Sequence, residues 1–101
     1  MKKYELIIDD FVEIDGEKLF RIKAIVDFSN IKSGDLGGYI SDESNLDHSG
    51  NAWVYDDAMV FGNAWVSGNA RVYDDARVSG NARVYDDAKV SNIEEKNNEQ
   101  Q

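Results

Sequence analysis

The chain contains no cysteine and a single histidine, His48, among its 101 residues. Without cysteine, disulfide bonds and thiolate metal sites are excluded. No apolar run approaches the roughly 18 residues with which a helix spans a membrane. The first residues, MKKYELIIDD, begin basic but reach two aspartates before the apolar segment of a signal peptide could form. We therefore expect one soluble domain in the cytoplasm.

Basic side chains are also scarce. The chain carries 11 lysines and arginines against 20 aspartates and glutamates, which gives a net charge of −9. Because contacts with phosphate need a basic surface, direct binding of nucleic acid is not expected. An acidic surface instead favours solubility or a basic protein partner.

The first third of the chain has the pattern of a hairpin. Residues 4–14 and 18–28 are rich in β-branched and aromatic side chains, and Asp15-Gly16 lies between them. A dipeptide of this type between two such segments predicts an N-terminal β-hairpin with one buried face. A glycine-rich junction follows at residues 29–39 and predicts tight backbone turns. The glycines concerned are Gly34, Gly37 and Gly38.

A six-residue pattern, the hexad, repeats from Asn51 to Val90. Each hexad has an alanine and, two residues later, a valine, followed by Tyr-Asp-Asp, Ser-Gly-Asn or Phe-Gly-Asn. The Ala-x-Val alternation predicts a very short strand with both side chains inward, and the next three residues are turn formers. A strand and a corner in every hexad predict a β-helix with coils about 4.8 Å apart. Such a stack needs caps, and the hairpin is expected to cover its first end.

The repeat resembles the hexapeptide-repeat proteins that fold as left-handed parallel β-helices with three hexads per triangular coil. The junction KSGDLGGYI at 32–40, with Asn45-Leu46 and GNAWVY at 50–55, also resembles small bacteriophage and prophage proteins. This resemblance implies an all-β chain with an N-terminal hairpin and junction at 1–35 and a left-handed β-helix of about three coils at 36–92. Some short acidic phage proteins inhibit host defence nucleases, so an anti-CRISPR-type role follows by analogy. The polar tail at 93–101 is expected to be disordered.

With three hexads per coil, the corner residues stack into columns, and six aspartates gather at two of the three edges. These two edges are the candidate surface for a protein partner. The candidate residues are Asp56, Asp57, Asp74, Asp75, Asp86 and Asp87, with the corner tyrosines Tyr55, Tyr73 and Tyr85. The expected partner is a basic protein of the bacterial host, such as the CRISPR effector nuclease Cas9 with its positively charged channel.

The paired aspartates have two other readings, as an acid and base or as calcium ligands. Gly-Asn occupies the same repeat positions at 50–51, 62–63, 68–69 and 80–81, which favours turn formation. Hexapeptide acyltransferases use a histidine base, and β-helical carbonic anhydrases need several histidines for zinc. We expect the single His48 to be a surface turn residue. The sequence therefore predicts no enzyme activity, no metal and no cofactor.

The residue between alanine and valine points outward on a flat face of the coil. The early hexads place apolar side chains there, at Trp53, Met59 and Trp65, and the later hexads place lysine or arginine. Two exposed tryptophans are unusual on a small soluble monomer. We expect these side chains to be covered by the hairpin, by a second copy of the chain or by another partner. A second function therefore stays open, that of a structural or oligomerisation module.

Overall fold

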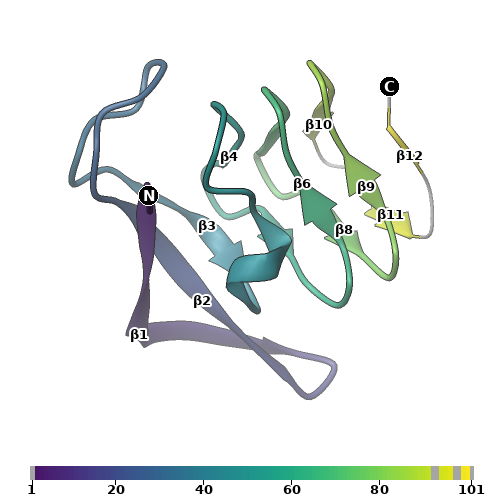
Figure 1. The fold of residues 1–101 in the computed structure, drawn as a ribbon. Helices are drawn as coiled ribbons and strands as arrows, with labels where there is room; N and C mark the ends of the chain where they lie inside the picture. Colours follow the sequence, from purple (N-terminus) through teal and green to yellow (C-terminus); the bar gives the residue numbers. More distant parts are fainter. Residues whose placement is uncertain (1, 92–93, 97–98, 101) are drawn as a thin grey trace.

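The computed structural model describes residues 2–91, 94–96 and 99–100, whose regular secondary structure is almost entirely β-strand (Figure 1). The elements are β1 Tyr4–Ile14, β2 Glu17–Ala24, β3 Leu36–Ile40, the 3-10 helix η1 Glu43–Asn45, β4 Trp53–Val54, β5 Met59–Val60, β6 Trp65–Val66, β7 Arg71–Tyr73, β8 Arg77–Ser79, β9 Arg83–Val84, β10 Lys89–Ser91, β11 Glu94–Lys96 and β12 Glu99–Gln100. Within these residues, no helix has the length and apolar character needed to cross a membrane.

The expected hairpin forms from β1 and β2, which pair in antiparallel orientation up to Ile14 and Glu17. The two turn residues have positive φ angles, 52° at Asp15 and 81° at Gly16. A two-residue turn with both φ angles positive matches the twist of the strands that it joins. β2 then pairs with β3, so the hairpin extends one sheet of the stack that follows.

The second hairpin strand is shorter than the predicted segment 18–28. β2 ends at Ala24, whose backbone N–H donates to the carbonyl of Asp35 at 2.8 Å. Its partner strand β3 begins only at Leu36, so residues 25–35 have no strand beside them and leave the sheet as a loop. This loop carries Phe28 across the outside of the first coil.

Two of the three predicted glycine turns are wrong. Gly34 has a φ of +100° and lies in a turn, but Gly37 and Gly38 lie inside β3 and have no positive φ. They are required for a different reason, which is the close approach of neighbouring backbone. A Cβ atom on Gly37 would lie 2.6 Å from the carbonyl oxygen of Val54.

The repeat builds a stack of coils whose strands pair in parallel with those of the next coil. β4, β7 and β10 form one sheet, β6, β9 and β12 form another, and β5, β8 and β11 continue the sheet of β1, β2 and β3. The repeat strands pair residues that are three hexads apart, such as Val54 with Val72 and Met59 with Arg77. Figure 1 shows the hairpin at one end of this stack and the C-terminal strands at the other.

The alanine and valine of each hexad fill the interior, and each is at most 5% exposed. At the corners, aspartate and glycine share one left-handed backbone position. Asp56, Asp74 and Asp86 have φ angles of 56–59°, and the glycines at the same place in other hexads, Gly62 and Gly68, have 67°. Glycine adopts this conformation freely and aspartate tolerates it. The backbone of the coil thus explains why Tyr-Asp-Asp and Ser-Gly-Asn can occupy the same position of the repeat.

The polar tail at 93–101, for which disorder is expected, lies partly within the described residues. The structure describes β11 and β12 within this range, paired in parallel with β8 and β9. Residues 93, 97, 98 and 101 lie outside the described part of the chain. Strand pairing at the open end of a stack uses backbone N–H and C=O groups, which a polar segment supplies as well as an apolar one.

Candidate functional site

The predicted acidic residues lie at the two ends of the strands of one sheet, the sheet of β4, β7 and β10. Residues 55–57 follow β4, residues 73–75 begin at the last residue of β7, and the two segments form one stack, which we call the Tyr-Asp column. Residues 85–87 precede β10 and stack on Asn69 and Asn51, and we call this stack the Asn-Asp column. All six aspartates are exposed and the three tyrosines are half-buried. The two columns therefore lie along the two edges of one surface, the β4–β7–β10 face, and Asp57 also forms an ion pair with Arg21 of β2, in the neighbouring sheet, at 3.4 Å.

The Tyr-Asp column is ordered by contacts between successive coils. The backbone N–H of Asp74 donates to Oδ2 of Asp56 at 3.1 Å. The hydroxyl of Tyr55 donates to Oδ1 of Asn30, in the loop after β2, at 3.3 Å. Burial raises the pKa of the Tyr55 hydroxyl, and the positive charge of Arg71 partly opposes that rise. The column is thus joined to the loop at its N-terminal end.

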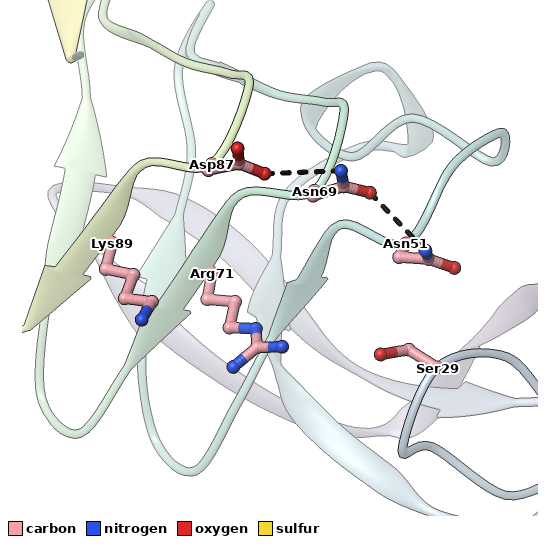
Figure 2. Close-up of a pocket in the computed structure, with 6 residues that line it drawn as sticks. All are labelled: Ser29, Asn51, Asn69, Arg71, Asp87 and Lys89. Atoms are coloured by element: carbon pink, nitrogen blue, oxygen red, sulfur yellow. Dashed lines mark hydrogen bonds between the residues drawn. The ribbon is translucent and has the colours of Figure 1, made fainter.

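The Asn-Asp column carries a ladder of side-chain hydrogen bonds, which Figure 2 shows as dashed lines. Nδ2 of Asn51 donates to Oδ1 of Asn69 at 3.4 Å, and Nδ2 of Asn69 donates to Oδ1 of Asp87 at 3.3 Å. The backbone supports the ladder, since the N–H of Asn69 donates to the carbonyl of Asp86 at 2.8 Å. Sequence reasoning did not assign Asn51 and Asn69 to the site, although the spacing of three hexads that links them to each other and to Asp87 was visible.

Two cations stand between the columns, on the outer side of the face. Arg71 and Lys89 are paired residues of β7 and β10, and both side chains are exposed. Among the residues that the structure describes, neither forms an ion pair. Figure 2 shows both side chains beside the ladder, with Ser29 facing them from the loop. We call Arg71 and Lys89 the cation pair.

The cation pair lines two neighbouring hollows on the face, which we together call the groove. The hollow on the side of the Asn-Asp column has a volume of about 330 Å³ and that on the side of the Tyr-Asp column about 340 Å³. Both are lined by Arg71 and Lys89. Their other lining residues are Ser29, Asn51, Asn69 and Asp87 for the first, and Asn30, Tyr55, Asp56 and Tyr73 for the second. The groove was not predicted from the sequence.

Comparison with protein families supports the architecture. Two stretches, residues 52–68 and 76–92, match the family model described as the YdcK beta solenoid repeat. The chain is a β-solenoid repeat protein. A comparison with curated proteins finds no significant match to it. Within the described ranges of the solenoid, no three histidine, aspartate or glutamate side chains are grouped closely enough to hold a metal ion.

The three apolar side chains predicted to face outward lie on three different sheets of the solenoid. Trp53 is only 1% exposed, because Phe28 and Tyr4 of the N-terminal segment pack edge-on against it, at ring distances of 5.3 and 6.2 Å. Met59 is half-buried against the cluster that contains Leu19. Trp65 remains 41% exposed. Trp53 and Met59 therefore pack within the chain, and Trp65 alone of the three is available to a partner.

His48 is part of a contact that holds the N-terminal segment on the solenoid. Its ring stacks on Tyr4 at a centroid distance of 4.0 Å. Nδ1 accepts from the backbone N–H of Lys3 at 3.1 Å, and Nε2 lies 2.8 Å from Oε1 of Glu43. Both ring nitrogens therefore have a partner in this packing contact, so a structural function accounts for the residue.

Two buried titratable groups lie at the same place. Nζ of Lys3 donates to the carbonyl of Ala52 at 2.7 Å and that of Gly50 at 3.2 Å. Burial lowers the pKa of Lys3 to about 8, and the negative charge of Asp47 partly opposes that shift. Burial raises the pKa of Tyr4, whose hydroxyl donates to the carbonyl of Leu46 at 2.6 Å.

We expect stability to rise with pH between about 8 and 10. In this window the unfolded chain keeps the Lys3 proton and the folded chain has lost it, so the free energy of unfolding increases. The gain is on the order of 1–2 kcal/mol, because solvent screens part of the full shift. Above pH 10 the gain is opposed, because Tyr4 ionises in the unfolded chain before the folded one.

Urea unfolding at pH 7, 8, 9 and 10 measures this slope. Lys3→Met removes the buried amine and should flatten the rise between pH 8 and 10, whatever its effect on stability at pH 7. A variant that keeps the full rise would show that Lys3 is not the titrating group.

Proposed function

We propose that this solenoid is a non-enzymatic inhibitor that binds a basic protein surface through its two acidic columns. In finer detail, we propose a left-handed β-helix of about three coils, of phage or prophage type, that acts in the cytoplasm of a bacterial host. The proposed partner is a defence nuclease that processes nucleic acid. A CRISPR effector such as Cas9 fits this description, because its channel for nucleic acid is positively charged.

One observation carries the proposal: six exposed aspartates lie in two columns along the edges of one face, and of these Asp57 is paired with Arg21 of β2. Charges arranged in this way steer an oppositely charged partner toward the face and reject partners of the same sign. The net charge of −9 strengthens the same field. The inhibitor would then occupy the basic surface that nucleic acid needs, without any chemical step.

The rigid backbone supports this use of the columns. Buried alanine and valine side chains fix each coil on the next, and backbone hydrogen bonds such as Tyr55 N–H to the Val72 carbonyl, at 2.7 Å, join the corners. The spacing of the carboxylates is therefore set before a partner arrives. A preorganised surface loses little conformational entropy when it binds.

The triple variant Asp56→Asn, Asp74→Asn and Asp86→Asn tests the acidic columns. Asparagine tolerates the left-handed backbone of these positions, so the variant removes three charges and keeps the corner. We expect its affinity for a Cas9–guide RNA complex to fall by about tenfold or more, because each charge that faces a basic partner contributes to binding. Surface binding at 0.1 and 0.5 M salt measures the loss, and the unmodified chain should itself bind more weakly at high salt.

The matched control changes three acids of β1, as Glu5→Gln, Asp9→Asn and Glu13→Gln. It alters the net charge equally but lies on the hairpin, away from the two columns. We expect the affinity of this control to change by about twofold at most, the effect of distant screened charges. Equal losses of affinity in the two variants would mean that net charge alone drives binding. If the column variant lost no affinity, the proposal would be wrong.

A structural or oligomerisation module is the second candidate, and the exposure of Trp65 favours it. This indole lies on the sheet of β6 and β9 beside Arg83, outside the β4–β7–β10 face. A defined multimer in light scattering would support this alternative. A monomer at high protein concentration would exclude it.

A further inference from the structure

We propose that the groove on the β4–β7–β10 face binds a small ligand that joins one phosphate to a flat aromatic ring, a nucleoside monophosphate by chemical class. The proposal does not rest on the inhibitor function. It uses the cation pair and the tyrosine and asparagine side chains of the two columns, whereas the inhibitor function uses the aspartates of the same columns.

The cation pair supplies the site for the phosphate. Arg71 and Lys89 are neighbours on paired parallel strands, which lie about 4.8 Å apart. Arginine presents a planar fork that matches phosphate oxygens, and lysine adds a compact point charge. Both head groups are exposed at the groove and, among the described residues, lack an ion-pair partner. One phosphate between them could contact both.

The carboxylates of the groove accept hydrogen bonds within the chain, whereas its cations have no ion-pair partner among the described residues. The two hollows share the same two cations and have one carboxylate each, so the groove as a whole is lined by two cations and two carboxylates. Asp56 accepts a hydrogen bond from the backbone of Asp74, and Asp87 accepts one from Nδ2 of Asn69. Both carboxylates are held at the walls by hydrogen bonds, whereas the cation pair has no ion-pair partner in the part of the chain that the structure describes, so its two head groups are the charges available to an anionic ligand.

The side chains that form the walls of the groove favour a ligand in which the anion is attached to an aromatic ring. Tyr55 and Tyr73 line the same hollow from successive coils and are half-buried. A tyrosine ring offers a face or edge for stacking with a nucleobase. On the opposite wall, Asn51 and Asn69 supply amide donors and acceptors of the kind that bind ribose or base edges. Volumes of about 330 and 340 Å³ lie at the lower end of the range for small-molecule sites.

The acidic columns restrict the ligand to a single phosphate. A nucleic acid strand carries phosphates along its whole length, and these would meet the exposed aspartates on either side of the groove. A monophosphate can reach the cation pair without extending over the columns. The same face can thus reject a nucleic acid chain and accept one nucleotide.

Titrations with AMP, adenosine and inorganic phosphate test the proposal, with amide chemical shifts of the ¹⁵N-labelled chain as the readout. We expect AMP to bind about tenfold more tightly than either adenosine or phosphate, because only AMP contacts both the cation pair and the tyrosine wall. The shifts should gather at Asn51, Asn69, Arg71, Tyr73 and Lys89. No binding of AMP at millimolar concentration, or equal binding of phosphate alone, would overturn the proposal.

Two variants locate the two parts of the ligand. Arg71→Gln with Lys89→Gln should weaken AMP by about tenfold or more, whereas Arg77→Gln with Arg83→Gln, an equal charge change on the other two sheets, should alter its affinity by about twofold at most. Tyr73→Leu should weaken AMP and leave phosphate unchanged. All the replaced side chains are exposed or half-buried, so the fold should persist. Unchanged AMP affinity in the Arg71/Lys89 variant would contradict the assignment, and it would leave the inhibitor function untouched.

Discussion

Replacing Trp53 by alanine should lower the free energy of unfolding by about 3–5 kcal/mol, the cost of deleting a buried aromatic side chain. The indole is 1% exposed and contacts both Phe28 of the loop and Tyr4 of β1. Its removal leaves a cavity between the N-terminal segment and the first coil. For a domain of this size, the melting temperature should fall by more than about 10 °C. Thermal and urea unfolding followed by circular dichroism measure the change.

Trp65→Ala is the matched control, because both tryptophans occupy the same place in an Asn-Ala-Trp-Val repeat. Trp65 is 41% exposed, so its removal loses much less buried area. We expect a cost of about 1 kcal/mol or less, near the usual range for surface substitutions. Equal losses in the two variants would mean that the N-terminal segment does not cover Trp53 in solution.

The two tryptophans also show where sequence reasoning reaches its limit. The repeat places both on the outside of a coil, and that placement is correct for the coil itself. The repeat carries no information about which outer face the N-terminal segment will cover. That choice depends on contacts between residues far apart in the sequence, such as Phe28 with Trp53 and Lys3 with Ala52.

The stacking of the repeat could be predicted because its interior is narrow. Only small and medium side chains fit where the sheets converge, so alanine and valine recur at fixed positions. The positive φ angle of one residue in each corner adds a second constraint, and glycine, asparagine and aspartate adopt this conformation at low energetic cost. These two constraints predict the stacking, and the resemblance to hexapeptide-repeat proteins implies three hexads per coil; the structure pairs Val54 with Val72 and places Asp74 on Asp56.

The groove could not be predicted in the same way. The pairing of Arg71 with Lys89 in the floor of the groove follows from their spacing of three hexads in the sequence. An outward cation in a repeat, however, is normally a solvated side chain. Its end is formed by Ser29 and Asn30, which come from the loop after β2. That loop exists because β2 ends at Ala24, earlier than its composition predicts, at the point where its antiparallel partner β3 begins.

The glycines of β3 provide the second large stability effect. We expect Gly38→Ala to lower the free energy of unfolding by about 3 kcal/mol or more, at the upper end of the cost of forcing an extra carbon into a packed interior. The new Cβ would overlap the carbonyl oxygen of Ala58 and lie 2.7 Å from Cγ1 of Val54. The same Ala58 carbonyl accepts the N–H of Tyr39 at 2.9 Å, so relief of the overlap must separate β3 from β5.

Gly16→Ala is the control for Gly38→Ala. Gly16 has a φ of +81° but no atom within 4 Å of a new Cβ, so only the backbone cost of about 1–2 kcal/mol applies. Hydrogen exchange distinguishes the two, because Gly38→Ala should expose the amides of Tyr39 and Ser41, which bind carbonyls of the first coil. Gly16→Ala should leave both amides protected. If both variants lost the same stability and kept this protection, the close approach of β3 to the first coil would not be what requires glycine at position 38.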